Sequence, residues 1–290
     1  SHKIYNESEE DKQQDLWFTK YGYDWHISDL QMTCIESEFP GNREQLLALK
    51  NTHVGECCFV IGNGPSLRAE DLEELKRRNI FCFASKRINK IFDKTTWRPD
   101  IWGASDLDYI KSCQDEISEI TGFTKLICAP AFVKEGIRIN DAIYYPFIQM
   151  ERRPPWFNLD IMRGVHFWGT ITCKLINFAA YMGFKKIYLL GVDNSYALKK
   201  DNTGKIIIDT SQKSYFAEDY MWQNEEANSN VIDTIKALDY VTESYKSLKW
   251  HCDQIGVEVV NATRGGALEA YPREDFDEIL AQWETTNNEM

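Results

Sequence analysis

The sequence predicts an α/β protein with a Rossmann-like parallel sheet flanked by helices. Two observations lead to this fold class. Short apolar runs alternate along the chain with segments of helical periodicity, which is typical of a parallel sheet. The run Lys186–Asp193 is almost continuously apolar, as expected of a central strand that is buried on both faces. A polar stretch at 194–230 has little regular pattern, and we expect it to form a lid insertion beside the site.

The predicted elements follow in chain order. Residues 1–50 are polar and charged, and 42–51 has the pattern of a short helix. Cys57–Ile61 is the first strand. It runs into a tight loop and then an amphipathic helix with Leu67, Leu72 and Leu75 at helical spacing. The remaining strands are predicted at 80–84, 99–104, 125–129, 186–193 and 257–261.

Two further helices complete the pattern. Residues 170–183 form a long apolar segment that ends at Gly183, a favourable C-terminal cap. Residues 231–255 form a second amphipathic segment. Each precedes a predicted strand, so both fit as crossover helices.

Composition excludes several classes of protein. Hydrophobic residues make up 43% of the 290, enough for a large core and too many for a disordered chain. The net charge of -12 makes sequence-independent nucleic-acid binding a poor fit. The eight cysteines form no C-x-x-C pair, which favours free core thiols in a reducing compartment over a zinc site or a disulfide framework. No apolar stretch reaches the length of a membrane span, about 18 residues or more.

Polar residues follow the predicted strands directly. In an open α/β sheet, ligands bind beyond the carboxyl ends of the strands, so these positions are candidates for a site. They are Gly62–Ser66, Ser85–Lys86, Ser105–Asp106, Asp193–Tyr196 and Asn261–Thr263.

The first of these loops has the chemistry of an anion site. It contains Gly62-x-Gly64, but Leu67 stands where a dinucleotide fingerprint has its third glycine. Glycines let the backbone approach a ligand, and the N–H groups of a following helix attract an anion. The alternative is a tight turn that merely needs glycine.

Three sequence blocks resemble a known superfamily. The segment Val60–Leu67 resembles the opening motif of the bacterial sialyltransferases of glycosyltransferase family 42, and of the related MptE-like (6-hydroxymethylpterin pyrophosphokinase-like) proteins of surface-polysaccharide loci. The block from Thr170 to Asp193 agrees with both. Asn261–Glu269 is similar to the MptE-like proteins specifically, and with Phe92–Pro99 the resemblance spans residues about 55 to 280.

The resemblance implies a nucleotide site. In the sialyltransferases the loop that matches Asn63–Ser66 holds the CMP part of the donor, the turn that matches Thr170–Thr172 contacts the base or phosphate, and a tyrosine near Tyr196 holds the phosphate. The expected substrate-binding residues are Gly62, Asn63, Gly64, Pro65, Ser66, Ser85, Ser105, Thr170, Thr172, Asp193, Tyr196 and Asn261. For Asp193, a structural cap of the next turn is an equally good interpretation.

The catalytic base of the family has no counterpart at the matching position of this chain. The position of the family's catalytic His falls near Ser229, and no His lies between 167 and 250. A base must be a titratable group within reach of the acceptor hydroxyl. Asp106 is the first candidate and His166 the second, although His166 also fits as a packed core residue. The carboxylates at 219–226 come third.

These observations predict a glycosyltransferase-like enzyme of bacterial surface-polysaccharide biosynthesis. It would use a nucleotide-activated sugar, CMP-linked by resemblance, and a glycan acceptor. No cofactor or metal is expected, although Asp106-Leu107-Asp108 is a D-x-D pattern that holds a metal in other glycosyltransferases. Two alternatives stay open. One is diphosphate transfer from ATP to a pterin-type hydroxymethyl group, which would need Mg²⁺. The other is a nucleotide-binding protein without catalysis.

The expected organisation is an N-terminal helical extension at 1–54 and a Rossmann-like nucleotide-binding catalytic domain at 55–290. A cytoplasmic location is expected. Peripheral attachment to the inner face of the membrane and assembly into a homo-oligomer are left open.

Overall fold

The computed structural model describes residues 23–149, 157–167, 169–195, 198–200, 206–208, 214–217, 220 and 231–288. Its centre is a seven-stranded sheet in the order β11-β8-β1-β2-β3-β4-β5, and every pairing is parallel. The strands are β1 (Cys57–Ile61), β2 (Cys82–Ser85), β3 (Ile101–Ala104), β4 (Thr124–Cys128), β5 (Ala142–Tyr145), β8 (Lys186–Leu190) and β11 (Glu258–Asn261). The predicted fold class is therefore confirmed.

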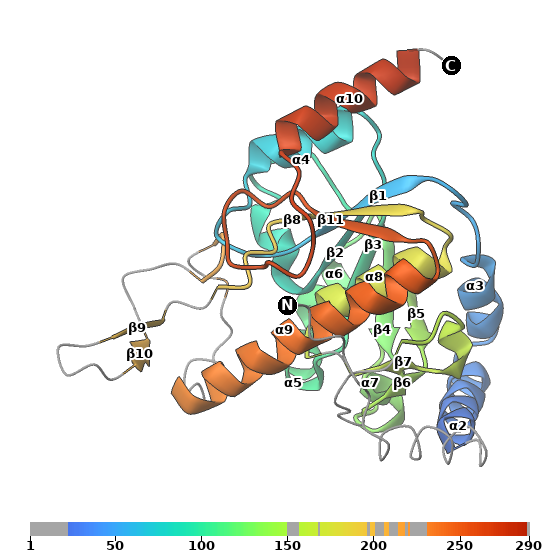
Figure 1. Ribbon diagram of the computed structural model, residues 1–290. Coiled ribbons are helices and arrows are strands. Elements are labelled where there is room, and N and C mark those ends of the chain that lie inside the picture. The colour runs from blue at the N-terminus through green and yellow to red at the C-terminus, as the bar shows by residue number, and fades with distance from the viewer. Residues whose placement is uncertain are drawn as a thin grey trace.

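Helices cover both faces of this sheet. They are α2 (Tyr23–Glu38), α3 (Asn42–Ala48), α4 (Ala69–Arg77), η1 (Lys86–Ile91), α5 (Leu107–Ser112), α6 (Gln114–Glu119), α7 (Pro130–Val133), η2 (Ile161–Arg163), α8 (Ile171–Tyr181), α9 (Val231–Gln254) and α10 (Phe276–Asn288). In Figure 1, α4 and α10 lie above β1, β8 and β11, whereas α8 and α9 lie below them. Two small sheets pair β6 (Phe147–Ile148) with β7 (Val165–His166) and β9 (Leu198–Lys200) with β10 (Ile206–Ile208). None of the described helices combines the length and apolar character needed to cross a bilayer.

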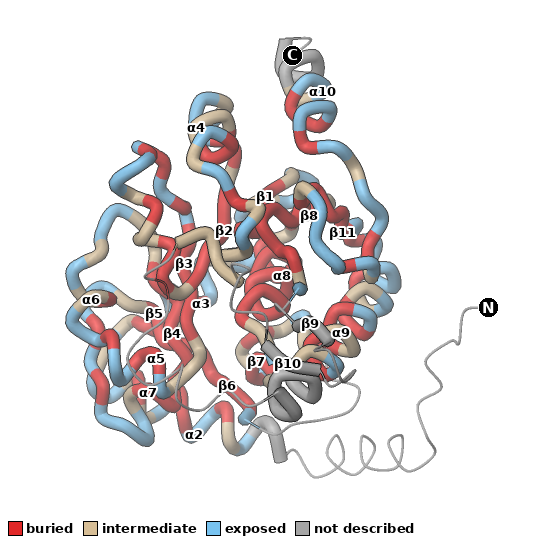
Figure 2. Tube along the Cα trace, turned by 90° about the vertical axis from the view of Figure 1, so that its left-hand side faces the viewer, coloured by how far each residue is buried: buried red, intermediate tan, exposed pale blue. Residues whose placement is uncertain are grey.

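Helix α8 is the centre of the core. All eleven of its residues are buried, because it packs between the sheet and α9. Figure 2 shows this continuous buried region running through the strands and α8. Its Leu175 lies against β3, where a Cβ atom on Gly103 would be 2.9 Å from the leucine side chain. Each buried Leu or Ile of such a helix contributes roughly 1.5–3 kcal/mol to folding.

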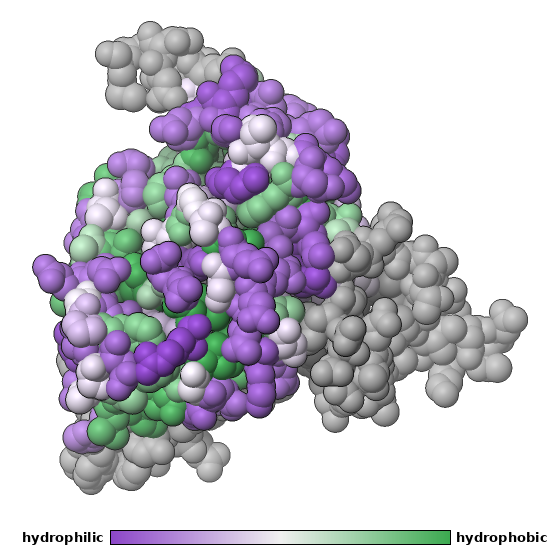
Figure 3. Space-filling model, turned by 180° about the vertical axis from the view of Figure 1, so that it is seen from behind, coloured by the Kyte–Doolittle hydropathy of each residue, from purple (hydrophilic) through white to green (hydrophobic). Residues whose placement is uncertain are grey.

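On the surface, hydrophilic side chains cover much of the face seen in Figure 3.

The helices before β1 are attached to the sheet by side-chain amides. The Asn42 side chain accepts a hydrogen bond from the Tyr144 N–H at 2.7 Å and donates one to its carbonyl at 2.8 Å. Gln31 makes the same two contacts with the backbone of Phe147, at 2.8 and 3.0 Å. Asn42 thus satisfies backbone groups of β5 at the open edge of the seven-stranded sheet, and Gln31 does the same for β6 in the small sheet with β7. The boundary between the predicted extension and domain, at 54/55, stays a prediction, and residues 1–22 lie outside the described residues.

All eight cysteines are free thiols, and six of them are buried. Cys58, Cys82 and Cys128 lie in β1, β2 and β4 as small apolar residues, and burial raises the pKa of each thiol. They are therefore held in the neutral form, which fits a packing role.

Candidate functional site

A large cavity lies at the carboxyl edge of the sheet. The chain proceeds from β1 through β2 to β5 in one direction, and β8 and β11 lie on the other side of β1. The strand order therefore reverses between β1 and β8, and ligands of open α/β sheets bind at such a reversal. The cavity is centred there and has a volume of about 620 Å³. That is the size of a small-molecule or nucleotide site.

Most of the predicted site residues meet in this cavity. Its lining includes Gly62, Asn63, Gly64, Ser85, Ser105, Asp106, Thr170, Thr172 and Asp193. Pro65 and Ser66 belong to the same loop as Gly64 but do not line the cavity, and neither do His166 and Asn261. Tyr196 lies outside the described residues, as do the carboxylates Asp219, Glu225 and Glu226. Four strand ends and the start of α8 thus converge on one space.

The glycine loop is packed tightly against the end of β8. A Cβ atom on Gly62 would lie 2.4 Å from the carbonyl oxygen of Gly191, and one on Gly64 would lie 1.8 Å from Asp193 Oδ2. Neither Gly62 nor Gly64 is among the residues with positive φ, whereas Gly191 has a φ of 69°. The glycines of this loop are needed because the two strand ends approach closely.

Asp193 holds the glycine loop in place. Its Oδ2 accepts a hydrogen bond from Ser66 Oγ at 2.7 Å, and its backbone carbonyl accepts one from the Ala267 N–H at 2.7 Å. Burial raises the pKa of the Asp193 carboxyl and outweighs the hydrogen bonds from Ser66, which lower it. Asp193 therefore has a structural role as the cap of this turn, and it also lines the cavity.

Asn63 connects the loop to two neighbouring segments. Its side-chain Nδ2 donates to the carbonyl oxygen of Ser85 at 3.1 Å, at the end of β2. Its own carbonyl oxygen accepts from the Phe216 N–H at 3.2 Å. One asparagine thus links the first strand end, the second strand end and the described part of the predicted lid.

The described part of the predicted lid borders the cavity. Ser214, Tyr215 and Tyr220 are among its lining residues. The rings of Tyr215 and Tyr220 stack with centroids 4.0 Å apart, and Arg87 Nη1 donates to the Tyr220 carbonyl at 2.7 Å. Most of 194–230 lies outside the described residues, so the lid itself stays a prediction.

Asp106 is held by two contacts. Its Oδ1 accepts from the Tyr109 N–H at 3.2 Å, which makes it the N-cap of α5, and Lys86 Nζ lies 2.9 Å from its Oδ2. Burial acts to raise the pKa of this carboxyl, but Lys86, the Tyr109 N–H and the charge of Lys174 together lower it below the usual value. Asp106 is therefore an ionised carboxylate at the cavity wall, and the same contacts reduce its basicity.

Lys86 adopts an unusual backbone conformation. Its φ is 47°, in the left-handed region that is disfavoured for a residue with a Cβ. The conformation is fixed from the neighbouring strand, because Trp102 Nε1 donates to the Lys86 carbonyl at 2.8 Å. Such strain persists where surrounding contacts impose it, often at functional sites. It places the ammonium of Lys86 between β2 and Asp106.

The start of α8 forms another wall. Thr170 is the N-cap, and its Oγ1 accepts from the Thr172 N–H at 3.4 Å. One turn further along the helix, Lys174 lines the cavity with a side chain that is only 2% exposed. The sequence interpretation missed Lys174. The available signal was a lysine within a mainly apolar helix. A lysine in such a helix usually extends its side chain until the ammonium reaches solvent, so the residue gave no clear indication of a site.

The remaining candidates have structural surroundings. His166 is buried in β7, in register with Ile148 of β6. The Asn261 side chain donates to the Leu268 carbonyl at 2.9 Å and accepts from the Thr263 N–H at 3.0 Å, which fixes the loop after β11. Neither residue lines the cavity.

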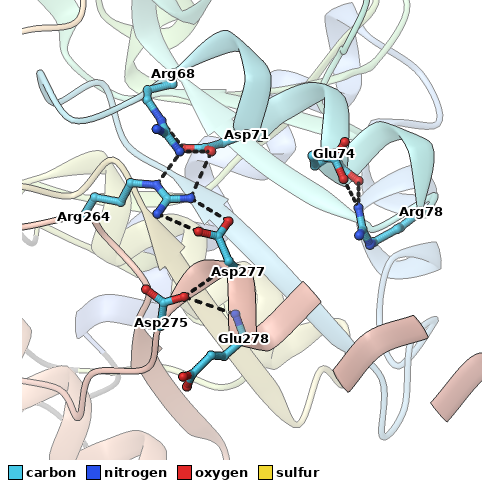
Figure 4. A network of polar contacts seen from close by, with 8 residues as sticks. All are labelled: Arg68, Asp71, Glu74, Arg78, Arg264, Asp275, Asp277 and Glu278. Atoms are coloured by element: carbon cyan, nitrogen blue, oxygen red, sulfur yellow. Dashed lines mark hydrogen bonds and ion pairs between the residues drawn. The ribbon is translucent and has the colours of Figure 1, made fainter. Parts of the chain in front are cut away.

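Arg264, which follows the same strand, belongs to an ion-pair network rather than to the cavity. Its guanidinium lies 3.3 Å from Asp71 on α4 and 2.8 Å from Asp277 on α10 (Figure 4). Arg68 approaches Asp71 from the other side at 2.6 Å. This network joins the loop after β11 to two helices on the opposite face of the sheet from α8.

Within the described ranges, no three His, Cys, Asp or Glu side chains lie close enough together to hold a metal ion. Asp106 and Asp108 of the D-x-D pattern both line the cavity. The first of them is already paired with Lys86. Metal dependence stays an open expectation.

Fold and site together define an α/β protein of the Rossmann-like class with a ligand cavity at its topological switch point. A family model described as 6-hydroxymethylpterin diphosphokinase MptE-like matches residues 36–199, more than half of the chain. The chain therefore belongs to the MptE-like family, as the resemblance predicts.

Comparison with known proteins adds little beyond the family. No curated protein matches the chain. Among solved structures, the chain is similar to the MAf glycosyltransferase from Magnetospirillum magneticum AMB-1, with a TM-score of 0.48 and 14% identity. The match covers 83% of this chain and 40% of that one, so this chain spans well under half of that protein's length. A match this weak supports no functional conclusion.

Proposed function

We propose that this chain is a transferase that binds a nucleotide-activated sugar in the switch-point cavity and passes the sugar to an acceptor hydroxyl. The observation that supports it is the meeting of the Gly62–Ser66 loop, three further strand ends and the start of α8 around one nucleotide-sized space. The N-terminus of a helix attracts anions, and α8 begins at the cavity wall, which suits the phosphate of such a donor. The resemblance of Asn63–Ser66 to a CMP-binding loop favours a CMP-linked donor in surface-polysaccharide assembly.

The proposed reaction is a displacement at the anomeric carbon. The acceptor oxygen forms a bond to that carbon while the bond from carbon to the phosphate oxygen breaks, and its electron pair leaves with the nucleotide. The acceptor proton passes to a base. When CMP is the leaving group, its phosphate gains one negative charge, so the site must stabilise more charge after transfer than before it.

Nucleotide binding tests this proposal. We expect CMP or CDP to raise the melting temperature more than ADP, ATP, UDP or GDP, each measured with and without Mg²⁺, because a ligand that binds only the folded state stabilises it by mass action. A ligand at about 100 times its dissociation constant adds about 2.7 kcal/mol of stability. If CMP and CDP give no shift, the CMP-linked donor is wrong.

The family description favours a second candidate function. A diphosphate transfer from ATP to a pterin-type hydroxymethyl group would use the same cavity. Such a transfer needs Mg²⁺ to bridge the phosphates. A stabilisation by ATP that appears only with Mg²⁺ supports this second function, whereas binding without turnover on any donor and acceptor supports a non-catalytic nucleotide-binding protein.

For the base we propose Asp106, which lines the cavity at the start of α5. Asp106→Asn removes the basic oxygen, and asparagine is an equally good N-cap, so α5 should persist. We expect release of the nucleotide from the donor selected by the binding panel to slow by roughly a hundredfold, with donor affinity retained. Asp160→Asn is the matched control, because Asp160 caps η2 in the same way and does not line this cavity. Loss of donor affinity with normal turnover would instead make Asp106 a binding residue.

A further inference from the structure

Lys174 is a buried cation inside the cavity. Its side chain is 2% exposed, and its Nζ lies 3.5 Å from the Thr170 carbonyl oxygen, at the limit of a hydrogen bond. The rings of Phe147 and Phe167 face the ammonium, with centroids 5.3 and 5.4 Å away. In the described part of the chain, no carboxylate lies within ion-pair distance of it. Asp106, a carboxylate whose charge acts on Lys174, is already paired with Lys86.

The place is electrostatically unfavourable for a cation. Lys174 is in the first turns of α8, where the helix dipole is positive, and the charge of Lys86 also opposes it. Removing an ammonium from water without a counter-ion is costly. The two aromatic rings offset part of this cost by cation–π attraction. A bound anion would supply the counter-ion that the Lys174 ammonium lacks among the described residues.

Another buried lysine shows the contrast. Lys125 in β4 is 1% exposed, and its Nζ reaches two carbonyl oxygens, those of Ser118 and Asn140, at 3.4 Å each. It lies outside the cavity lining. The two lysines thus have hydrogen bonds of similar length, but Lys125 has two of them away from the cavity, whereas Lys174 has one and lines the cavity.

We propose that Lys174 and the N-terminus of α8 form the anion subsite that holds the phosphate of the nucleotide and stabilises the charge it gains on leaving. The inference rests on the proposed function and names the residue that stabilises the departing nucleotide. In the transfer, the electron pair of the broken carbon–oxygen bond stays on the phosphate oxygen, and Lys174 provides the fixed positive charge opposite it. Because the phosphate charge increases during transfer, this attraction is strongest after the bond breaks, which is the condition for catalysis.

The first measurement compares ligands with and without phosphate. Titration calorimetry of CMP, cytidine and inorganic pyrophosphate is carried out on wild type, Lys174→Met and the control Lys125→Met. We expect Lys174→Met to bind CMP and pyrophosphate roughly ten- to a hundredfold more weakly, the worth of one charged hydrogen bond, and to leave cytidine binding unchanged. Lys125→Met should match wild type for all three.

The outcomes separate this inference from the proposed function. If folded Lys174→Met binds CMP and pyrophosphate as wild type does, the subsite is wrong. If wild type binds pyrophosphate but no cytidine nucleotide, and Lys174→Met loses pyrophosphate, the CMP-linked donor is wrong and the anion subsite stands. If wild type binds neither, both proposals fail. Circular dichroism of each variant confirms that a loss of binding is not a loss of fold.

Discussion

Replacing Lys174 by methionine should make the ligand-free protein more stable, by roughly 3 kcal/mol at neutral pH. Burial lowers the pKa of the Lys174 ammonium to about 8 from its ordinary 10.5. Below pH 8 the folded protein therefore carries a buried charge whose cost the unfolded chain does not bear. Methionine has a similar shape and no charge, so the variant avoids this cost.

The gain should depend on pH in a defined direction. Between about pH 8 and 10.5 the folded protein has lost a proton that the unfolded chain still binds, so wild-type stability rises relative to the variant. Above about 10.5 both states of wild type are neutral, and this part of the difference disappears. The groups that act on Lys174 are Cys173, Cys128, Lys86 and Asp106. Burial raises the pKa of Cys128 to about 12 and that of Cys173 as well, while the pKa of Asp106 is lowered, so these three hold their charge states through the window.

Urea unfolding of both proteins at pH 7 and pH 10 measures the effect. The difference in unfolding free energy should shrink clearly between the two pH values. Lys111→Met serves as the control for simple charge removal, because the Lys111 side chain is 67% exposed, and it should change stability little. A gain for Lys174→Met that is equal at both pH values would reflect apolar packing alone, and a loss at pH 7 would show that the ammonium has a stabilising partner.

At position 174, folding and ligand binding favour different side chains, so replacing the lysine is expected to stabilise the fold. Folding alone favours an apolar side chain at position 174, since all the other residues of α8 are buried as well. Binding of an anion favours the lysine. The two Lys174 experiments therefore test opposite sides of the same argument, stability without ligand and affinity with it.

Much of the sheet could be predicted because its strands are buried on both faces. β1 is a continuous apolar run, and its predicted bounds are those of the structure. The strand predicted at 186–193 ends earlier, because β8 stops at Leu190 and the next residue, Gly191, has a φ of 69°. β5 was not predicted. It has only four residues, lies at the edge of the sheet and depends on the Asn42 amide, which comes from a helix 102 positions earlier in the chain. An edge strand held by a distant side chain leaves little local signal.

The site was predictable to the level of strand ends but not of side-chain roles. The rule that ligands bind beyond the carboxyl ends selected Gly64, Ser85 and Asp106, which do line the cavity. The rule also selected Asn261, which does not line the cavity. A strand-end position does not reveal whether its side chain turns toward the cavity or, as here, into the following loop. The pairing of Lys86 with Asp106 joins two strand ends 20 positions apart, and only the sheet order brings them together.

The second large effect is expected from Gly64→Val, which should weaken nucleotide binding by on the order of a hundredfold or more. A side chain at this position would place its Cβ 1.8 Å from Asp193 Oδ2 and 2.8 Å from the Gly191 carbonyl oxygen. Neither separation is sterically possible, so the loop must move away from β8. That movement breaks the hydrogen bond between Ser66 and Asp193 and displaces the part of the cavity wall that Gly62, Asn63 and Gly64 form. Overpacking of this kind also costs about 1–3 kcal/mol of stability.

Gly122→Val separates the loss of binding from the loss of stability. Gly122 has a φ of 96° and open space around its Cβ position, so valine there strains the backbone without touching the cavity. We expect a lower melting temperature for both variants but weakened nucleotide binding, measured by calorimetry well below either melting temperature, only for Gly64→Val. Wild-type affinity in a folded Gly64→Val protein would mean that the loop relaxes without disturbing the ligand. Gly62–Ser66 would then be a turn that supports the strand end, and the phosphate contacts would have to come from α8 and Lys174.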